Sequence, residues 1–218
     1  MALAYPLTRA QFMDILPISA QSLTLPEQME LNRTGSGEQL AADLGDRLWQ
    51  GEITLGRLMR SEAGRSEVLI DLSRQAGRSF LLYDTRRPAP LLDPTGSILG
   101  AATPTIDTLS GDPRELRVTG LPAGYVLSPG DYLSFTYGAS PVRYALHRVV
   151  ATTTASGLGL TPLFEVTPHI RSGAVIGAAV TLRKAHCKAV ILAGSVKDGV
   201  GRRTITEGIG FGYVQTLR

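Results

Sequence analysis

Residues 115–150 constrain the fold most, because they contain three successive runs that are typical of β-strands. The runs are rich in aromatic and β-branched residues, and turn sequences divide them. At residues 128–131, Pro129 presets φ and Gly130 accepts the positive φ of a type II turn. A second break lies at residues 138–141. The stretch predicts a β-module with a tight hairpin at residues 128–131.

Composition supports a chain dominated by short strands. The 218 residues include 24 glycines and 13 prolines, which favours many turns, so helix is expected to be the minority. Lys and Arg number 22 against 19 Asp and Glu, and this balance gives no support by itself to a nucleic-acid partner. The length allows one or two domains with a sizeable core.

One helix is predicted, over residues 62–76. Ser61 is suited to the N-cap and Gly77 to the position after the C-cap. A strand over residues 79–83 follows at once, and a half-buried strand beginning near Trp49 precedes the helix. The expected apolar stripe of the helix consists of Val68, Leu69, Leu72 and Ala76.

A connector rich in Pro and Arg at residues 84–90 predicts a domain crossing. The middle region, residues 86–185, has about five expected strands and suits a small barrel or sandwich. Residues 1–30 are interpreted as a leading segment and a first strand, and residues 32–38 as a polar, glycine-rich loop. The N-terminus lacks the pattern of a secretory signal, and the apolar run at 174–182 is too short to span a membrane.

Catalytic and metal-binding motifs are not apparent. The single cysteine, Cys187, excludes an intramolecular disulfide, and neighbours on a strand point to opposite faces, so His186 and Cys187 are not expected to form a dyad. His147 and His169 are interpreted as structural histidines, because no carboxylate spacing suggests a metal site. The chain is therefore expected not to be an enzyme, and to have no catalytic, cofactor-binding or metal-binding residues.

The last strand has a face of glycines. Gly208, Gly210 and Gly212 alternate with Ile209 and its apolar neighbours, so another backbone can come close to them. One interpretation is a bulged strand crossed by a neighbouring loop. The other makes these three glycines candidates for a subunit interface.

The aromatic residues of the central strands leave two interpretations open. Beside Arg143 and Arg148, they could form a stacking surface for single-stranded nucleic acid on an oligonucleotide-binding barrel. Alternation along a strand buries every second residue, which favours the interpretation that they are core. The aromatic residues concerned are Tyr132, Phe135, Tyr137 and Tyr144.

From about Trp49 onward, the chain resembles the distal tail proteins of long-tailed bacteriophages and prophages. The segments that carry the resemblance are RQAGRSFLLYD, GDYLSF, ALHRVV and PHIRSGAVIGAAVTL, followed by CKAVILAGS and a C-terminal strand. The resemblance implies a mainly β fold: a ring-forming β-sandwich domain with one helix, from residues 1–85 and 186–218, and an inserted small barrel of the oligonucleotide-binding type at 86–185. Residues 1–45 match no segment of the family.

The resemblance also implies a structural virion protein. Such proteins form a ring, six-fold in the family, at the distal end of the tail, and join the tail tube protein to the hub and to tail fibre or receptor-binding proteins. The expected location is the virion tail tip, after synthesis in the host cytoplasm, with no membrane segment and no specific nucleic-acid binding. The chain has no room for the large carbohydrate-binding-like domain of longer members. The alternative is a single-stranded nucleic-acid-binding β-barrel protein.

Overall fold

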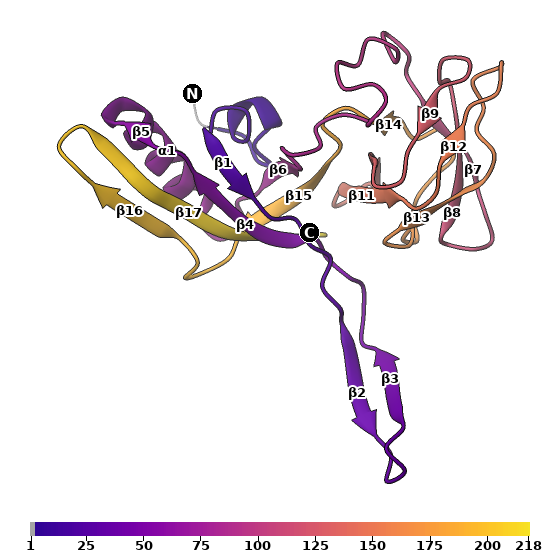
Figure 1. Ribbon diagram of the computed structural model, residues 1–218, viewed down its shortest axis with the longest axis horizontal. Coiled ribbons are helices and arrows are strands. Elements are labelled where there is room, and N and C mark those ends of the chain that lie inside the picture. The colour runs from indigo at the N-terminus through magenta and orange to yellow at the C-terminus, as the bar shows by residue number, and fades with distance from the viewer. Residues whose placement is uncertain (1–2) are drawn as a thin grey trace.

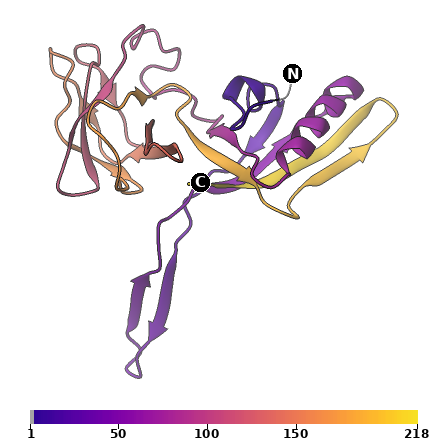
Figure 2. The ribbon, with the colours of Figure 1, turned by 180° about the vertical axis from the view of Figure 1, so that it is seen from behind.

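The computed structural model describes residues 3–218, which form two β-rich bodies and one hairpin that projects from the region between them (Figure 1). One body is a curled sheet with a single α-helix, α1 (Arg60–Ser73), and the other is a small barrel. The reverse view shows α1 lying along the sheet (Figure 2). The prediction of a mainly β chain with one helix and a barrel is confirmed. The domain expected as a β-sandwich holds its seven strands in one sheet.

The first sheet is built around the long C-terminal strand β17. Its main path runs β1–β4–β17–β15–β6, and two further strands, β5 and β16, pair with the N-terminal half of β17. The strands are β1 (Ile18–Gln21), β4 (Gln50–Leu55), β5 (Leu58–Met59), β6 (Phe80–Tyr83), β15 (His186–Ile191), β16 (Lys197–Gly201) and β17 (Ile205–Gln215).

Apolar alternation along β17 supplies the core of this sheet. Ile209, Phe211 and Tyr213 are buried, as their period of two requires. Phe12, which follows the short 3-10 helix η1 (Arg9–Gln11), packs on Phe80 of β6 with ring centroids 4.3 Å apart. Aromatic pairs at this spacing add favourable contacts to the burial of apolar area. The leading segment thus covers the sheet instead of lying free of it.

Helix α1 begins two residues earlier and ends three residues earlier than the prediction of 62–76. Met59, not Ser61, occupies the N-cap, because the Glu62 carboxylate reaches back and accepts the Met59 backbone N–H at 3.0 Å. Gly77 has a φ of +80° but lies beyond the C-cap Arg74, so it shapes the turn after the helix.

The buried face of α1 differs from the predicted stripe. Val68 is 58% exposed and Ala76 is also exposed. Leu69 and Leu72 are half-buried and Leu69 packs against the core, so the predicted stripe is correct only in part. The residues that α1 buries are Ala63, Ser66, Ile70 and Ser73.

The second body is a six-stranded sheet in the order β14–β10–β11–β13–β8–β7. An antiparallel bridge between Thr105 and Ala179, beside β14, brings its two edges together, so the sheet nearly closes into a barrel. Its strands are β7 (Thr105–Leu109), β8 (Glu115–Thr119), β10 (Tyr132–Tyr137), β11 (Arg143–Val149), β13 (Phe164–Thr167) and β14 (Val180–Thr181).

The turn at residues 128–131 is present, but the hairpin expected around it is wrong. Asp131 N–H donates to Ser128 O at 3.0 Å and Gly130 has a φ of +88°. The strand before the turn, β9 (Val126–Leu127), pairs with β12 (Thr153–Thr154), whereas β10 pairs with β11 and β14. The Asp131 carboxylate accepts N–H groups from both Ser128 and Leu91, and so holds the chain around a corner between two sheets.

The barrel lies between two strands that are neighbours in the first sheet. The chain leaves at the end of β6 and returns at the start of β15, and these strands pair with His186 opposite Tyr83. Because the exit and the return are adjacent in space, the barrel can be inserted without breaking the sheet.

The projecting hairpin consists of β2 (Met29–Arg33) and β3 (Gln39–Asp43), and we call residues 29–43 the arm. Figures 1 and 2 both show it extending away from the sheet and the barrel, with the C-terminus beside its base. The interpretation of residues 32–38 as a loop is correct only in part, since Asn32 and Arg33 belong to β2.

Candidate functional site

Cys187 and His147, two of the residues considered for chemistry, are buried in structural surroundings. Cys187 is fully buried, and burial raises the pKa of its thiol to about 12. His147 is buried in the barrel, with Nδ1 2.7 Å from Pro168 O and its ring stacked on Phe135. Among residues 3–218 no group of His, Cys, Asp and Glu could hold a metal ion.

The aromatic side chains of the central strands are core. Tyr132, Phe135 and Tyr137 are each at most 5% exposed. Arg148 Nη2 donates to the Tyr132 hydroxyl at 2.7 Å, and its guanidinium lies over the ring of Trp49. The interpretation as core is confirmed for these three rings, whereas Tyr144 is half-buried, and the buried rings form no stacking platform.

The glycine face of β17 is in contact with the chain's own backbone and side chains. A Cβ on Gly210 would lie 2.8 Å from Ile53 O, and one on Gly212 would lie 3.1 Å from Ser195 Cβ. Gly208 has a φ of +82° and lies beside Gly199 of β16. These contacts account for all three glycines without a second subunit. Their role as a subunit interface stays a prediction.

The arm is the most exposed part of the described chain. Nine of its ten strand residues are exposed, including Leu31 and Leu40 at 51% and 54%. An isolated two-stranded hairpin is marginally stable in water, and both of its outer edges present unpaired backbone groups. The hairpin was not predicted from the sequence. Its signal is there, because a loop that contains glycine separates the two short runs at residues 29–33 and 39–43.

The root of the arm is held by two arginines. Arg47 donates to the carbonyls of Leu25 and Pro26 at 2.6 and 3.1 Å, which ties the returning strand to the outgoing one. Arg171, from the barrel, donates to Asp46 Oδ2 and to Arg47 O, each at 2.9 Å. The barrel therefore fixes the direction in which the arm leaves the body.

His169 adds a second barrel contact to the same carboxylate, with Nε2 3.2 Å from Asp46 Oδ1. The side chains of both residues are nearly half exposed, so this pair contributes less than the Arg171 contact, whose side chain is only 11% exposed. The structural interpretation of His169 is consistent with this position.

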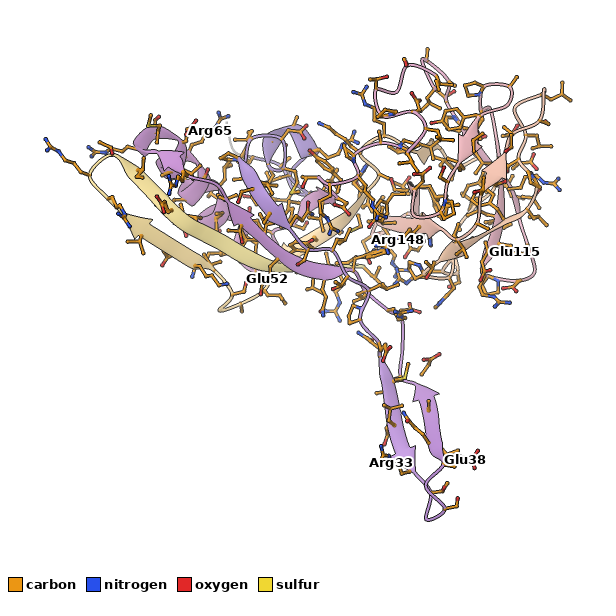
Figure 3. All side chains as sticks on the ribbon, viewed as in Figure 1. Arg33, Glu38, Glu52, Arg65, Glu115 and Arg148 are labelled. Carbon is orange, nitrogen blue, oxygen red and sulfur yellow. The ribbon has the colours of Figure 1, made fainter. Side chains whose placement is uncertain are left out.

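A buried network joins the sheet to the barrel. Trp49 Nε1–H donates to Leu146 O at 2.8 Å, and the Tyr132 hydroxyl donates to Asp84 Oδ2 at 3.2 Å. The Asp84 carboxylate also accepts two bonds from the Arg86 guanidinium and one from the Arg86 backbone N–H, each at 3.0 Å. The Arg86 guanidinium is held charged, since the Asp84 carboxylate raises its pKa. Figure 3 shows Arg148 at this junction, above the base of the arm.

These observations describe a β-rich body that carries one exposed arm. The arm with its root is the candidate functional site. Neither the protein-family models nor the curated proteins compared with the sequence match it. No helix within residues 3–218 has both the length and the apolar character that crossing a membrane requires.

Proposed function

We propose that the protein is a structural subunit that assembles with further copies of itself into a ring at the distal end of a bacteriophage tail. In that position the ring joins the tail tube protein to the hub and to tail fibre or receptor-binding proteins at the virion tail tip. The tail assignment rests on the sequence resemblance, and the ring, six-fold in that family, follows from it.

The arm is the observation that supports self-assembly. Its exposed leucines and its two open edges lack partners in the single copy, whereas its root is clamped by Arg47 and Arg171. A hairpin that is held firmly at its base and exposed along its length is suited to reach a neighbour. Where the arm of each copy reaches the next copy and the contact is not returned, the interface is heterologous, and such contacts generate rings when the rotation closes.

The nucleic-acid alternative receives no support from the geometry. It needs the aromatic residues of β10 exposed together with arginines, and Tyr132, Phe135 and Tyr137 are buried.

Native mass spectrometry of the full chain over a range of concentrations tests the proposal. The matched variant replaces residues 30–42 with Asn-Gly, because Met29 and Asp43 are directly paired and a two-residue turn can join them. We expect rings or smaller oligomers from the unaltered chain and monomers from the short-arm variant. A monomer at every concentration, or assembly that survives loss of the arm, would overturn the proposal.

A single-stranded oligonucleotide added to the same samples tests the alternative. Assembly is expected to be indifferent to it. A monomer that takes up the oligonucleotide, with binding that weakens steeply as salt rises, would instead support the nucleic-acid function.

A further inference from the structure

The two faces of the arm carry different charges. Strand alternation and the observed register place Met29, Leu31, Arg33, Gln39, Ala41 and Asp43 on one face, where the arginine and the aspartate offset each other. The other face, which we call the acidic arm face, has two carboxylates and no basic residue, and consists of Glu30, Asn32, Leu40 and Ala42, with Glu38 next in the alternation. Figure 3 labels Arg33 beside β2 and Glu38 beside β3, both near the tip of the arm.

The acidic arm face combines charge with apolar surface. Leu40 is 54% exposed and is paired with Asn32. The next pair on this face, toward the root of the arm, contains Glu30, and Glu38 follows Leu40 toward the tip. The Asn32 amide donates to Glu30 Oε1 at 3.4 Å, and the Glu30 carboxylate has no cationic partner among residues 3–218. The face therefore suits a surface with an apolar floor and basic rims.

Such a surface exists where α1 begins and the β16–β17 turn passes beside it. There a shallow, largely open groove is lined by Met59, Arg60, Ser61, Gly64, Arg203 and Thr204, and we call it the basic groove. Met59 is 62% exposed and, with Gly64, gives the groove its apolar character. Arg60 and Arg203 lie at the groove without an ion-pair partner in the described part of the chain, and the one carboxylate at this helix start, Glu62, is engaged by the Met59 backbone N–H.

Within one copy the arm and the groove do not meet. The β16–β17 turn lies at the end of the sheet distant from the barrel, whereas the arm leaves from the region between the sheet and the barrel (Figures 1 and 2). Figure 3 likewise shows Arg65 on α1 far from Glu38 near the arm tip. Any contact between these complementary surfaces must join two copies.

We propose that the acidic arm face of one copy docks in the basic groove of the next, with Leu40 on the apolar floor and Glu30 and Glu38 facing Arg60 and Arg203. This inference rests on the proposed self-assembly and names the surfaces that carry it. Each copy offers one arm and one groove, so the contact repeats in one direction around a closed ring. Burying Leu40 against Met59 removes two exposed apolar side chains from water, and the charge pairs fix the register.

Two charge-reversed full-length variants test the docking. One carries Glu30→Arg with Glu38→Arg, and the other carries Arg60→Glu with Arg203→Glu. Each variant alone presents like charges at the contact, so its self-association should weaken by about tenfold or more. A mixture of the two should recover assembly as hetero-oligomers, because the arm of each variant then matches the groove of the other.

Matched controls separate docking from a general effect of charge. Arg33→Glu changes the other face of the arm, and Arg74→Glu changes the other end of α1, where Arg74 pairs with Asp71. Both variants should assemble like the unaltered chain. Circular dichroism of each variant verifies that it folds.

The outcomes distinguish the two proposals. Assembly that needs the arm but is unaffected by reversing Arg60 and Arg203, or that does not recover on mixing, would overturn the docking inference and leave the ring proposal standing. A chain that never assembles overturns both. Assembly that weakens in each reversed variant, recovers on mixing and tolerates the controls establishes the docking.

Discussion

Arg171 of the barrel donates from Nε to Oδ2 of Asp46, at the root of the arm, at 2.9 Å. These residues are far apart in the chain, and their contact couples the direction of the arm to the position of the barrel. The same guanidinium holds the Arg47 carbonyl, also at 2.9 Å, and Arg47 in turn holds the strand that leads into the arm. The arm therefore leaves the body from a braced base.

Arg171→Ala is expected to loosen this base. It removes two hydrogen bonds from a charged donor, which are worth more than neutral ones, and leaves Asp46 with only His169. Hydrogen exchange of the Leu44 amide, which donates to Gln28 O at the root, should become at least about tenfold faster. The control is Arg114→Ala, which breaks an exposed pair with Asp112 on the barrel and should leave the Leu44 amide unchanged. Equal exchange in both variants would contradict the bracing role.

Trp49→Phe is expected to weaken the junction between the sheet and the barrel. The change keeps an aromatic ring but leaves the buried Leu146 carbonyl without the indole N–H, which costs about 1–3 kcal/mol. Urea unfolding followed by circular dichroism measures the loss. The control is Tyr144→Phe, which removes a hydroxyl from a partly exposed ring on β11, the strand that contains Leu146. It should change the free energy of unfolding by less than about 0.5 kcal/mol. Equal stabilities of the two variants would count against a junction role for the indole.

Stability is expected to fall as the pH drops from about 6.5 to about 4. Burial lowers the pKa of His147 to about 4, only partly opposed by its bond to Pro168 O, and the nearby Arg171 and His169 lower it further. Below its ordinary pKa of about 6.5 the unfolded chain binds a proton that the folded chain does not. The contribution of neutral His147 to the free energy of unfolding is thus fully present above pH 6.5. About 3 kcal/mol of it is lost as the pH falls to about 4.

Urea midpoints measured across this pH range test the titration of His147. His147→Gln should give a flatter profile between pH 6.5 and 4, with lower stability at neutral pH because the packing changes. An unchanged slope in His147→Gln would show that another group titrates.

Gly210→Ala is expected to destabilise the fold by about 1–3 kcal/mol, because the new methyl group would lie 2.8 Å from the Ile53 carbonyl oxygen of the neighbouring strand. Gly64→Ala is the matched control, and its effect on stability is expected to have the opposite sign. No atom lies within 4 Å of the added methyl group in α1, so helix propensity should stabilise the protein by up to about 1 kcal/mol. Thermal unfolding of both variants checks the signs, and a neutral Gly210→Ala would show that β17 can move away from β4.

The sequence determined the features that depend on neighbours along the chain. The apolar alternation in β17, the turn at Gly130 and the presence of one helix follow from periodicity and from the φ angles that Gly and Pro allow. Such signals are local, and they survive in whatever topology the chain adopts. The rings of β10 go beyond alternation, because this strand is buried on both faces, with Tyr132 in the core of the first sheet and Phe135 in the core of the barrel.

Only the tertiary structure decided which elements meet. The pairing of β9 with β12 instead of β10, and the small-residue face of α1, depend on surfaces supplied from elsewhere in the chain. The clamp of Arg171 on Asp46 depends on residues brought together only when the barrel packs beside the sheet. Local pattern specifies which face of a strand is apolar, but long-range packing selects what covers it, and that selection leaves the arm uncovered.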